Sequence, residues 1–258
     1  MRHPIPISIL LATFLALARD ASGQEWPAWA KDLPEKAVEA KVGDKVWATV
    51  PAGVGEMVTV MVCTVSAAEG SSATLADQLG RKYDKVPGAL IHPLLDRSEV
   101  KGGEVVHGYQ WGFGSIVCRV TKLGRQAEMK HWWFQKVTDG KLDDFEPLRT
   151  GVEPMAWISY PSREETSQGF CIALDGDRAW ILEGAGQVVE VAKGDLGALP
   201  IGAKDFQAGD KVLGYKYGFG YQPGTVESVV EPGLAYVVKL DDDDDSEAWY
   251  FADLVPAP

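Results

Sequence analysis

Two stretches of the chain carry aromatic residues at the same spacing, and they are the strongest candidates for ligand chemistry. Gly103–Gly114 aligns without gaps on Gly209–Gly220, with seven of twelve residues identical and an offset of 106 residues. Aromatic rings in such loops can line a groove for a peptide or another ligand, or they can pack between neighbouring folding units. A small unit buries too little apolar surface alone, so packing between units has to be considered. Both interpretations stay open.

Five consecutive aspartates, Asp241–Asp245, could offer oxygen ligands to a calcium ion. Calcium sites draw their ligands from alternating positions around a turn that usually contains glycine, and this run lacks that spacing. We therefore interpret the run as a solvated hairpin tip that is also able to contact calcium weakly or a peptide rich in lysine and arginine. No metal site is predicted.

The three cysteines, Cys63, Cys118 and Cys171, are predicted to lie on the second strand of three successive units. The fourth unit has Gly224 in this region, which indicates a position for a small side chain. Free cysteine behaves as a small hydrophobic residue, and the spacing does not match a metal site. We expect three free thiols in separate cores, with a disulfide as the less favoured alternative.

No pattern in the chain predicts catalysis. His92 stands beside a proline, and His107 occupies a place that other units fill with Trp47 or Leu213. A nucleophile elbow, a zinc-ligand spacing and a phosphate-binding loop are all missing from the sequence. We expect a non-catalytic protein without a cofactor.

Residues 1–23 have the pattern of a signal peptide. A basic start at Arg2 precedes an apolar run, Ile5–Leu17, that is too short to span a bilayer, and small residues follow it. Cleavage is expected after Gly23, with Ala18 as the alternative site, and an uncleaved anchor is the less favoured reading. We expect an exported protein, periplasmic or extracellular, with no membrane span.

The chain is acidic, with a formal net charge of -12. Such a charge repels phosphate backbones, so nucleic acid is not an expected partner. It favours solubility and a cationic ligand. The sequence does not predict the oligomeric state.

Four units follow one another along the chain. Gly43–Val46 is repeated as Gly209–Val212, and Val42–Pro51 aligns on Val152–Pro161 through three identities. Each unit also ends close to a proline. The predicted boundaries are a signal peptide at 1–23, a linker at 24–36, and units at 37–96, 99–150, 151–202 and 205–258.

Short β strands are predicted within each unit. Asp175-Gly176 is a strong hairpin signal between two apolar runs, and Pro232-Gly233 marks a turn in the fourth unit. Alternating and β-branched residues favour strands, and no stretch has helical periodicity. The fold class is therefore predicted to be all-β.

The fourth unit resembles one known family along its whole length. The residues that carry the similarity are Gly209–Tyr215, Gln222–Val226, Tyr236–Asp242 and Asp253–Pro256. They resemble the Tudor or Agenet type of SH3-like barrel; the second unit matches less completely, and the first and third match in part. The resemblance implies four tandem SH3-like, Tudor-like barrels.

In Tudor domains, aromatic residues of the first loop and of the acidic turn hold a methylated ammonium by cation–π attraction. The matching positions here carry Lys216, Gln222, Leu240 and Asp243, with Tyr217 one place beyond the first. The resemblance thus implies the barrel fold, and it does not imply a complete cage.

We predict an exported, non-catalytic protein whose tandem barrels bind a protein or peptide segment, with a cationic segment as one candidate. The alternatives are a structural cell-envelope component whose barrels self-associate, and a cell-wall glycan-binding protein. The candidate ligand-binding residues are Tyr109, Trp111, Phe113, Tyr215, Tyr217, Tyr221 and Trp249.

Overall fold

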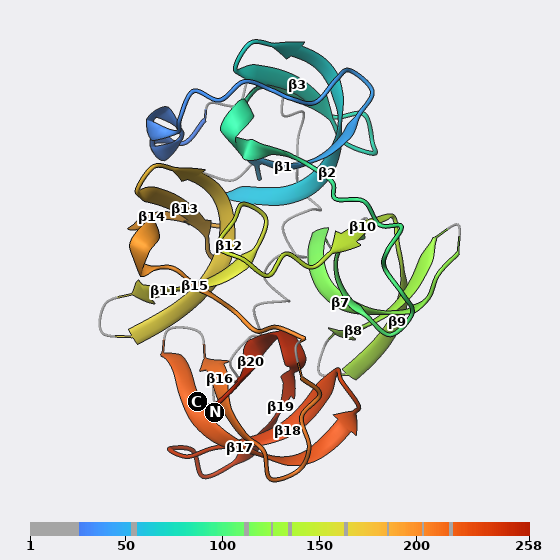
Figure 1. Cartoon of the computed structure of the whole chain (residues 1–258), viewed down its shortest axis with the longest axis vertical. Coiled ribbons are helices and arrows are strands. Elements are labelled where there is room, and N and C mark those ends of the chain that lie inside the picture. The colour runs from blue at the N-terminus through green and yellow to red at the C-terminus, as the bar shows by residue number, and fades with distance from the viewer. Residues whose placement is uncertain are drawn as a thin grey trace.

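The computed structural model describes residues 26–52, 56–110, 114–124, 126–133, 136–162, 165–184, 186–202, 204–216 and 219–258. These residues form four five-stranded antiparallel sheets, joined by turns and short 3-10 helices (Figure 1). We refer to the four sheets with their turns as modules 1 to 4. The all-β prediction is confirmed.

The strands of each module come from one continuous stretch of chain. Module 1 contains β1 (Lys45–Pro51), β2 (Val58–Glu69), β3 (Ser72–Ala76), β4 (Lys82–Pro87) and β5 (Ile91–Pro93). Module 2 contains β6 (Val105–Gln110), β7 (Gly114–Lys122), β8 (Ala127–Trp133), β9 (Lys136–Leu142) and β10 (Asp144–Pro147). Module 3 contains β11 (Trp157–Ser162), β12 (Glu165–Asp175), β13 (Arg178–Leu182), β14 (Val188–Ala192) and β15 (Gly197–Ala198). Module 4 contains β16 (Lys211–Lys216), β17 (Gly220–Glu231), β18 (Ala235–Leu240), β19 (Ser246–Tyr250) and β20 (Leu254–Pro256). The 3-10 helices are η2 (Ala28–Asp32), η3 (Gly88–Leu90), η4 (Lys193–Asp195) and η5 (Phe251–Asp253).

All four modules have the same strand order, in which the fifth strand lies beside the first and strands one to four follow in sequence. The long second strand of every module carries a β-bulge. A bulge bends its strand and increases the local twist, so one strand can take part in both halves of a curved sheet. The register shifts lie between Val65 and Ala67, Val120 and Lys122, Cys171 and Ala173, and Val226 and Ser228.

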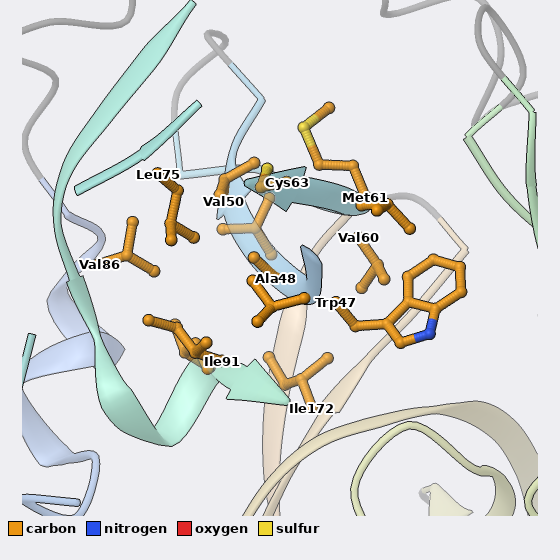
Figure 2. Packing of buried hydrophobic residues seen from close by; sticks show 14 of the residues in the cluster. Trp47, Ala48, Val50, Val60, Met61, Cys63, Leu75, Val86, Ile91 and Ile172 are labelled. Atoms are coloured by element: carbon orange, nitrogen blue, oxygen red, sulfur yellow. The ribbon is translucent and has the colours of Figure 1, made fainter. Parts of the chain in front are cut away.

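The strand β1 shows why the modules are not independent. Successive strand residues point to opposite faces, yet Val46 to Pro51 are all buried. Figure 2 shows Val86 and Leu75 on one side of β1 and Trp47 on the other. The Trp47 ring stacks on His107 of module 2 with the centroids 4.0 Å apart. Because one face packs inside the module and the other against its neighbours, β1 has no solvent-exposed face.

The modules form a ring (Figure 1). Module 1 lies beside modules 2 and 3, and module 4 closes the ring on their other sides, so the chain crosses the ring between modules 2 and 3. Polar contacts connect each neighbouring pair: Lys45 with Asp144, Val58 with Gly186, Arg119 with Asp205, and Tyr221 with Gln168.

The ring repeats a pair of modules. The second strands β2 and β7 lie against each other where modules 1 and 2 meet, and β12 and β17 do the same where modules 3 and 4 meet. This agrees with the 106-residue offset between the most similar stretches, which belong to modules 2 and 4.

The alignment of the third unit is corrected by the backbone. The N–H groups of Gly43, Gly103 and Gly209 donate to the second strand in modules 1, 2 and 4, and the N–H of Met155 makes the same bond in module 3. All four residues have a positive φ, 71° for Met155. The gapless alignment placed Glu153 opposite Gly43, so it was wrong by two residues.

The same shift changes the position of one cysteine. Strand pairing places Cys63 and Cys118 opposite the same residue of the first strand as Gly169 and Gly224. Cys171 lies two residues further along β12 than this position. All three cysteines are buried and free, as predicted.

The predicted linker at 24–36 is packed in its described part. Trp26, Trp29 and Leu33 lie against a hydrophobic cluster that modules 1, 2 and 3 share. The carbonyl of Asp32 accepts a hydrogen bond from Arg178 of module 3 at 3.2 Å. Residues 26–33 therefore help to join two modules. The predicted signal peptide lies outside the described residues.

Candidate ligand-binding site

Of the seven predicted binding residues, Trp111, Phe113 and Tyr217 lie outside the described residues. The structure places the other four at three different locations.

Tyr109 is part of the boundary between modules 1 and 2. Its side chain is fully buried, and its ring meets Trp47 edge to face with the centroids 6.4 Å apart. A side chain without exposed surface cannot contact a ligand in this conformation. The packing interpretation therefore applies to Tyr109.

Tyr215 and Tyr221 lie where modules 3 and 4 meet. Their ring centroids are 5.3 Å apart, and Tyr215 is 7% exposed. The hydroxyl of Tyr221 donates to Oε1 of Gln168 on β12 at 3.1 Å. These two residues also serve mainly to join modules.

Trp249 lies on β19, and its side chain is half-buried. Its ring covers Gly214 so closely that a Cβ at that glycine would come within 3.2 Å of the indole. Glycine at this position therefore makes room for the indole on the sheet of module 4. Part of the ring surface stays exposed beside the acidic hairpin.

Phe219 is the most exposed aromatic ring that the structure describes, at 58%. It belongs to the turn between β16 and β17, and its N–H donates to the carbonyl of Lys216. Nε2 of Gln222 donates to the carbonyl of Phe219 at 2.6 Å. Hydrogen bonds therefore hold both the N–H and the carbonyl of Phe219, whose ring lies in solvent.

The ammonium of Lys216 lies between an aromatic ring and a carboxylate. Its Nζ is 2.9 Å from Oδ2 of Asp243 and 5.7 Å from the centroid of Phe219. Opposite charge and the negative face of the ring both attract a cation at these distances. We call Phe219 and Asp243 the cation site.

The five aspartates form the hairpin tip between β18 and β19, as predicted. Four of them are exposed, and Asp243 is partly buried. Within the described ranges, no three His, Cys, Asp or Glu side chains converge as metal ligands would. The other four aspartates add negative charge to the hairpin tip that carries Asp243.

Phe219 was not among the binding residues predicted from the sequence. The signal was present, because Phe219 occupies the same place in the repeat as Phe113, which was included. What the sequence could not show is which rings of the loop turn inward. Tyr215 is buried and Phe219 is exposed, although only three residues lie between them in the sequence.

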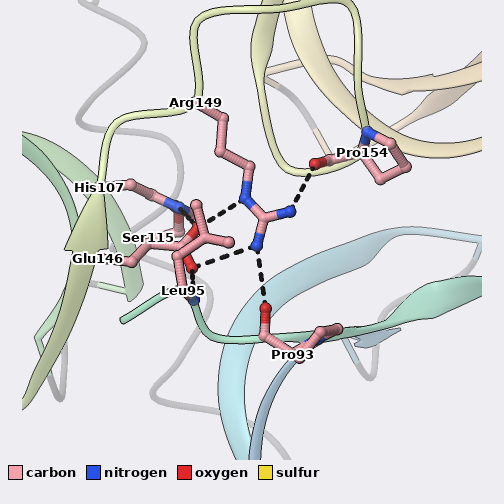
Figure 3. A network of polar contacts seen from close by, with 7 residues as sticks. All are labelled: Pro93, Leu95, His107, Ser115, Glu146, Arg149 and Pro154. Atoms are coloured by element: carbon pink, nitrogen blue, oxygen red, sulfur yellow. Dashed lines mark hydrogen bonds and ion pairs between the residues drawn. The ribbon is translucent and has the colours of Figure 1, made fainter. Parts of the chain in front are cut away.

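The most extensive polar network lies elsewhere, where modules 1, 2 and 3 meet (Figure 3). Arg149 donates to Glu146 and to the carbonyls of Pro93 and Pro154, one from each neighbouring module. Burial would raise the pKa of Glu146, but the nearby His107 and the hydrogen bonds from Arg149 and the Leu95 N–H outweigh it and lower the pKa to about 2. We call this network the hub.

The two histidines near the hub are held neutral by burial. Burial lowers the pKa of His107, which stacks on Trp47 at 4.0 Å, and Nε2 of His107 lies 2.6 Å from the Ser115 hydroxyl. Burial also lowers the pKa of His92 to about 4, and its Nε2 lies 2.8 Å from the carbonyl of Ile172. Both rings make contacts between structural elements.

The cysteines have the environment of core residues. Burial raises the pKa of the thiols of Cys63 and Cys171 to about 12, and it also raises that of Cys118. A thiol with a raised pKa contains little thiolate at neutral pH, and the thiolate is the nucleophile and metal ligand.

No protein-family model matches the chain, and no curated protein matches it. Among solved structures, the chain is similar to the four MBT repeats of Drosophila melanogaster Sfmbt, crystallised in complex with the peptide RHR(me)KVLR. The identity is 10%, the similarity covers 84% of this chain and 88% of the other, and the TM-score is 0.17. A score this low supports no conclusion about fold or ligand. In the part of the chain that the structure describes, no helix has the length and apolar character needed to cross a membrane.

Proposed function

We propose that the chain is an exported, non-catalytic binding protein, and that module 4 binds a cationic segment of another protein. The ligand's lysine or arginine side chain would contact Phe219 and Asp243. The observation that carries this proposal is the position of Lys216, whose ammonium already makes both contacts. The site therefore accepts a cation in the geometry that a ligand would need.

Electrostatics supports a cationic ligand. The acidic tip and the net charge of -12 attract positive segments over a distance of several ångströms in dilute salt. The cation site itself is partly exposed, since the side chain of Asp243 is 39% accessible. Affinity for a single cation should therefore be modest, and several charges along a peptide would strengthen it.

The modules themselves are best interpreted as SH3-like, Tudor-like barrels. Five antiparallel strands in one repeated order, a bulged second strand and an apolar interior support this interpretation. It does not by itself identify a ligand, because one fold serves many functions.

The test is binding of an N-acetylated hexaarginine amide to the full chain, measured by isothermal titration calorimetry at low and high salt. We expect saturable binding that weakens as salt rises. Phe219→Ala and Asp243→Asn should each weaken it about three- to ten-fold, because each removes one attraction to the cation.

Matched variants separate the site from general charge effects. Leu79→Ala removes another exposed apolar side chain, and Asp195→Asn removes another exposed carboxylate, in modules 1 and 3. Both should bind the peptide as the original chain does. Equal weakening by Asp195→Asn and Asp243→Asn would rule out the cation site.

One observation favours a second function. Tyr109 and Tyr215, both expected at a ligand groove, are buried at module boundaries. An aromatic set used for packing suits a structural component of the cell envelope that self-associates. Analytical ultracentrifugation over a wide concentration range distinguishes the two, because self-association would appear as a rising mass without any peptide.

A further inference from the structure

Lys216, whose contacts identify the cation site, also occupies that site. Lys216 is the last residue of β16, and its side chain is 29% exposed. We propose that Lys216 is an internal competitor, which a ligand cation must displace before it can bind. This proposal rests on the proposed function of module 4 and adds a regulatory residue to it.

Lys216 competes effectively because it is covalently attached close to the cation site. Lys216 and Phe219 belong to one turn, closed by the bond from the Phe219 N–H to the Lys216 carbonyl at 2.9 Å. A cation attached this closely has a high effective concentration at the site, whereas a ligand arrives from dilute solution.

The exposure of the pair makes displacement possible. Both side chains of the Lys216–Asp243 pair are partly in water, and pairs of this kind contribute little to stability. A ligand that brings several positive charges gains additional attraction from the acidic tip, which Lys216 alone cannot use. The lysine therefore weakens the binding of single cations and permits the binding of strongly basic segments.

The repeat shows that a cation is not needed at this place for folding. The position of Lys216 in module 4 is filled by Gln110 in module 2, at the same point of the same strand pairing. A neutral side chain is thus compatible with this end of the strand.

The experiment compares Lys216→Met with Lys211→Met in the full chain, using the same N-acetylated hexaarginine amide as probe. Both changes remove one positive charge from β16, but the Lys211 ammonium donates to the hydroxyl of Thr225 and does not lie at the cation site. We expect Lys216→Met to bind about five-fold tighter than Lys211→Met, as the loss of a partly exposed competitor predicts.

A second measurement follows the lysine itself. The probe contains no amine, so acetic anhydride labels only the protein, and mass spectrometry reports the labelling rate of each lysine. The probe should raise the labelling rate of Lys216 and leave that of Lys211 unchanged.

The outcomes separate this proposal from the one it rests on. Probe binding by the original chain, with equal affinities for the two methionine variants, overturns the competitor and leaves the binding function intact. A labelling rate of Lys216 that falls on probe binding also overturns it. No binding by any of the three proteins overturns both proposals.

Discussion

Glu146 and Arg149 form a buried ion pair at the point where three modules meet. Nε of Arg149 is 2.9 Å from Oε1 of Glu146, and the two side chains are 8% and 0% exposed. Removing one partner leaves a buried charge without compensation, which typically costs about 3–5 kcal/mol. We therefore expect Arg149→Met to lower the free energy of unfolding by that amount, measured by urea denaturation.

A matched change at the surface calibrates this result. Lys122 pairs with Glu128 at 3.6 Å, and both side chains are more than half exposed. Lys122→Met should cost less than about 1 kcal/mol. If Arg149→Met costs no more than Lys122→Met, the hub does not hold the three modules together.

The Glu146–Arg149 pair also predicts how the stability of the folded chain changes at acid pH. The pKa of Glu146 is lowered to about 2 in the folded chain, from an ordinary value of 4.5. The folded state therefore binds fewer protons than the unfolded state between these values. The contribution of Glu146 to stability should be complete above about pH 4.5 and be lost as the pH drops toward 2. In Glu146→Gln this part of the pH dependence should disappear from thermal unfolding curves, while the variant is less stable at neutral pH.

The extent to which the sequence predicted this structure depends on the kind of signal. The turn glycines and the alternating apolar residues predicted strands and a repeated unit, because these features are local. The third unit was misaligned because Met155 takes the positive-φ position that glycine fills in the other modules, and Trp157 matched Trp47 by chance. Local patterns fail where a residue adopts an unfavourable backbone conformation that its surroundings enforce.

Which aromatic residues face solvent was not predictable from the sequence. Tyr109 and Tyr215 hold the same place in the repeat, and both are buried, Tyr109 against Trp47 of module 1. That burial depends on how the modules are arranged in the ring, and no single unit encodes it. The hub was missed for the same reason, since Glu146 and Arg149 gain their roles only where modules 1 and 3 cover them.

Asp144 and Asp253 occupy equivalent positions in modules 2 and 4 but have different polar partners. Asp144 of module 2 pairs with Lys45 at 2.8 Å, whereas among the described residues Asp253 of module 4 receives a single side-chain hydrogen bond, from Gln168 at 3.4 Å. Burial raises the pKa of Asp253 to about 7. Since the folded state then binds the proton more tightly, stability should fall as the pH rises from about 4 to about 7 and stay level above.

Asp253→Asn tests this difference. The variant should be more stable than the original chain at pH 8, by roughly 1–3 kcal/mol, and about equally stable at pH 5, where Asp253 is protonated. Asp144→Asn is the control, because it loses an ion pair and should be less stable at both values. A stabilising effect of Asp253→Asn that is equal at pH 5 and pH 8 would contradict a raised pKa.

The cysteines predict a simple chemical result. Cys63, Cys118 and Cys171 are buried, and burial raises the pKa of each thiol. An aromatic disulfide reagent should therefore react with almost no cysteine of the native chain at neutral pH and with three cysteines in denaturant. Rapid reaction of one thiol in the native chain would show that its module opens readily.

Gly169 gives the sharpest test of the repeat. Strand pairing makes it equivalent to Cys63, so both positions require a small side chain, but module 3 has less room. A Cβ at Gly169 would lie 2.4 Å from Cγ2 of Ile181 and 3.0 Å from the carbonyl of Leu182. We expect Gly169→Ala to cost about 1–3 kcal/mol through overpacking, measured by urea denaturation.

The control for this change is Gly194→Ala in η4, where a Cβ would meet no atom within 4 Å. It should leave stability nearly unchanged. Combining Gly169→Ala with Ile181→Ala should cost less than the sum of the two single changes, because the new methyl group fills part of the space that the isoleucine vacates. Additive costs would mean that the two side chains do not meet, and the register that makes Gly169 equivalent to Cys63 would then be incorrect.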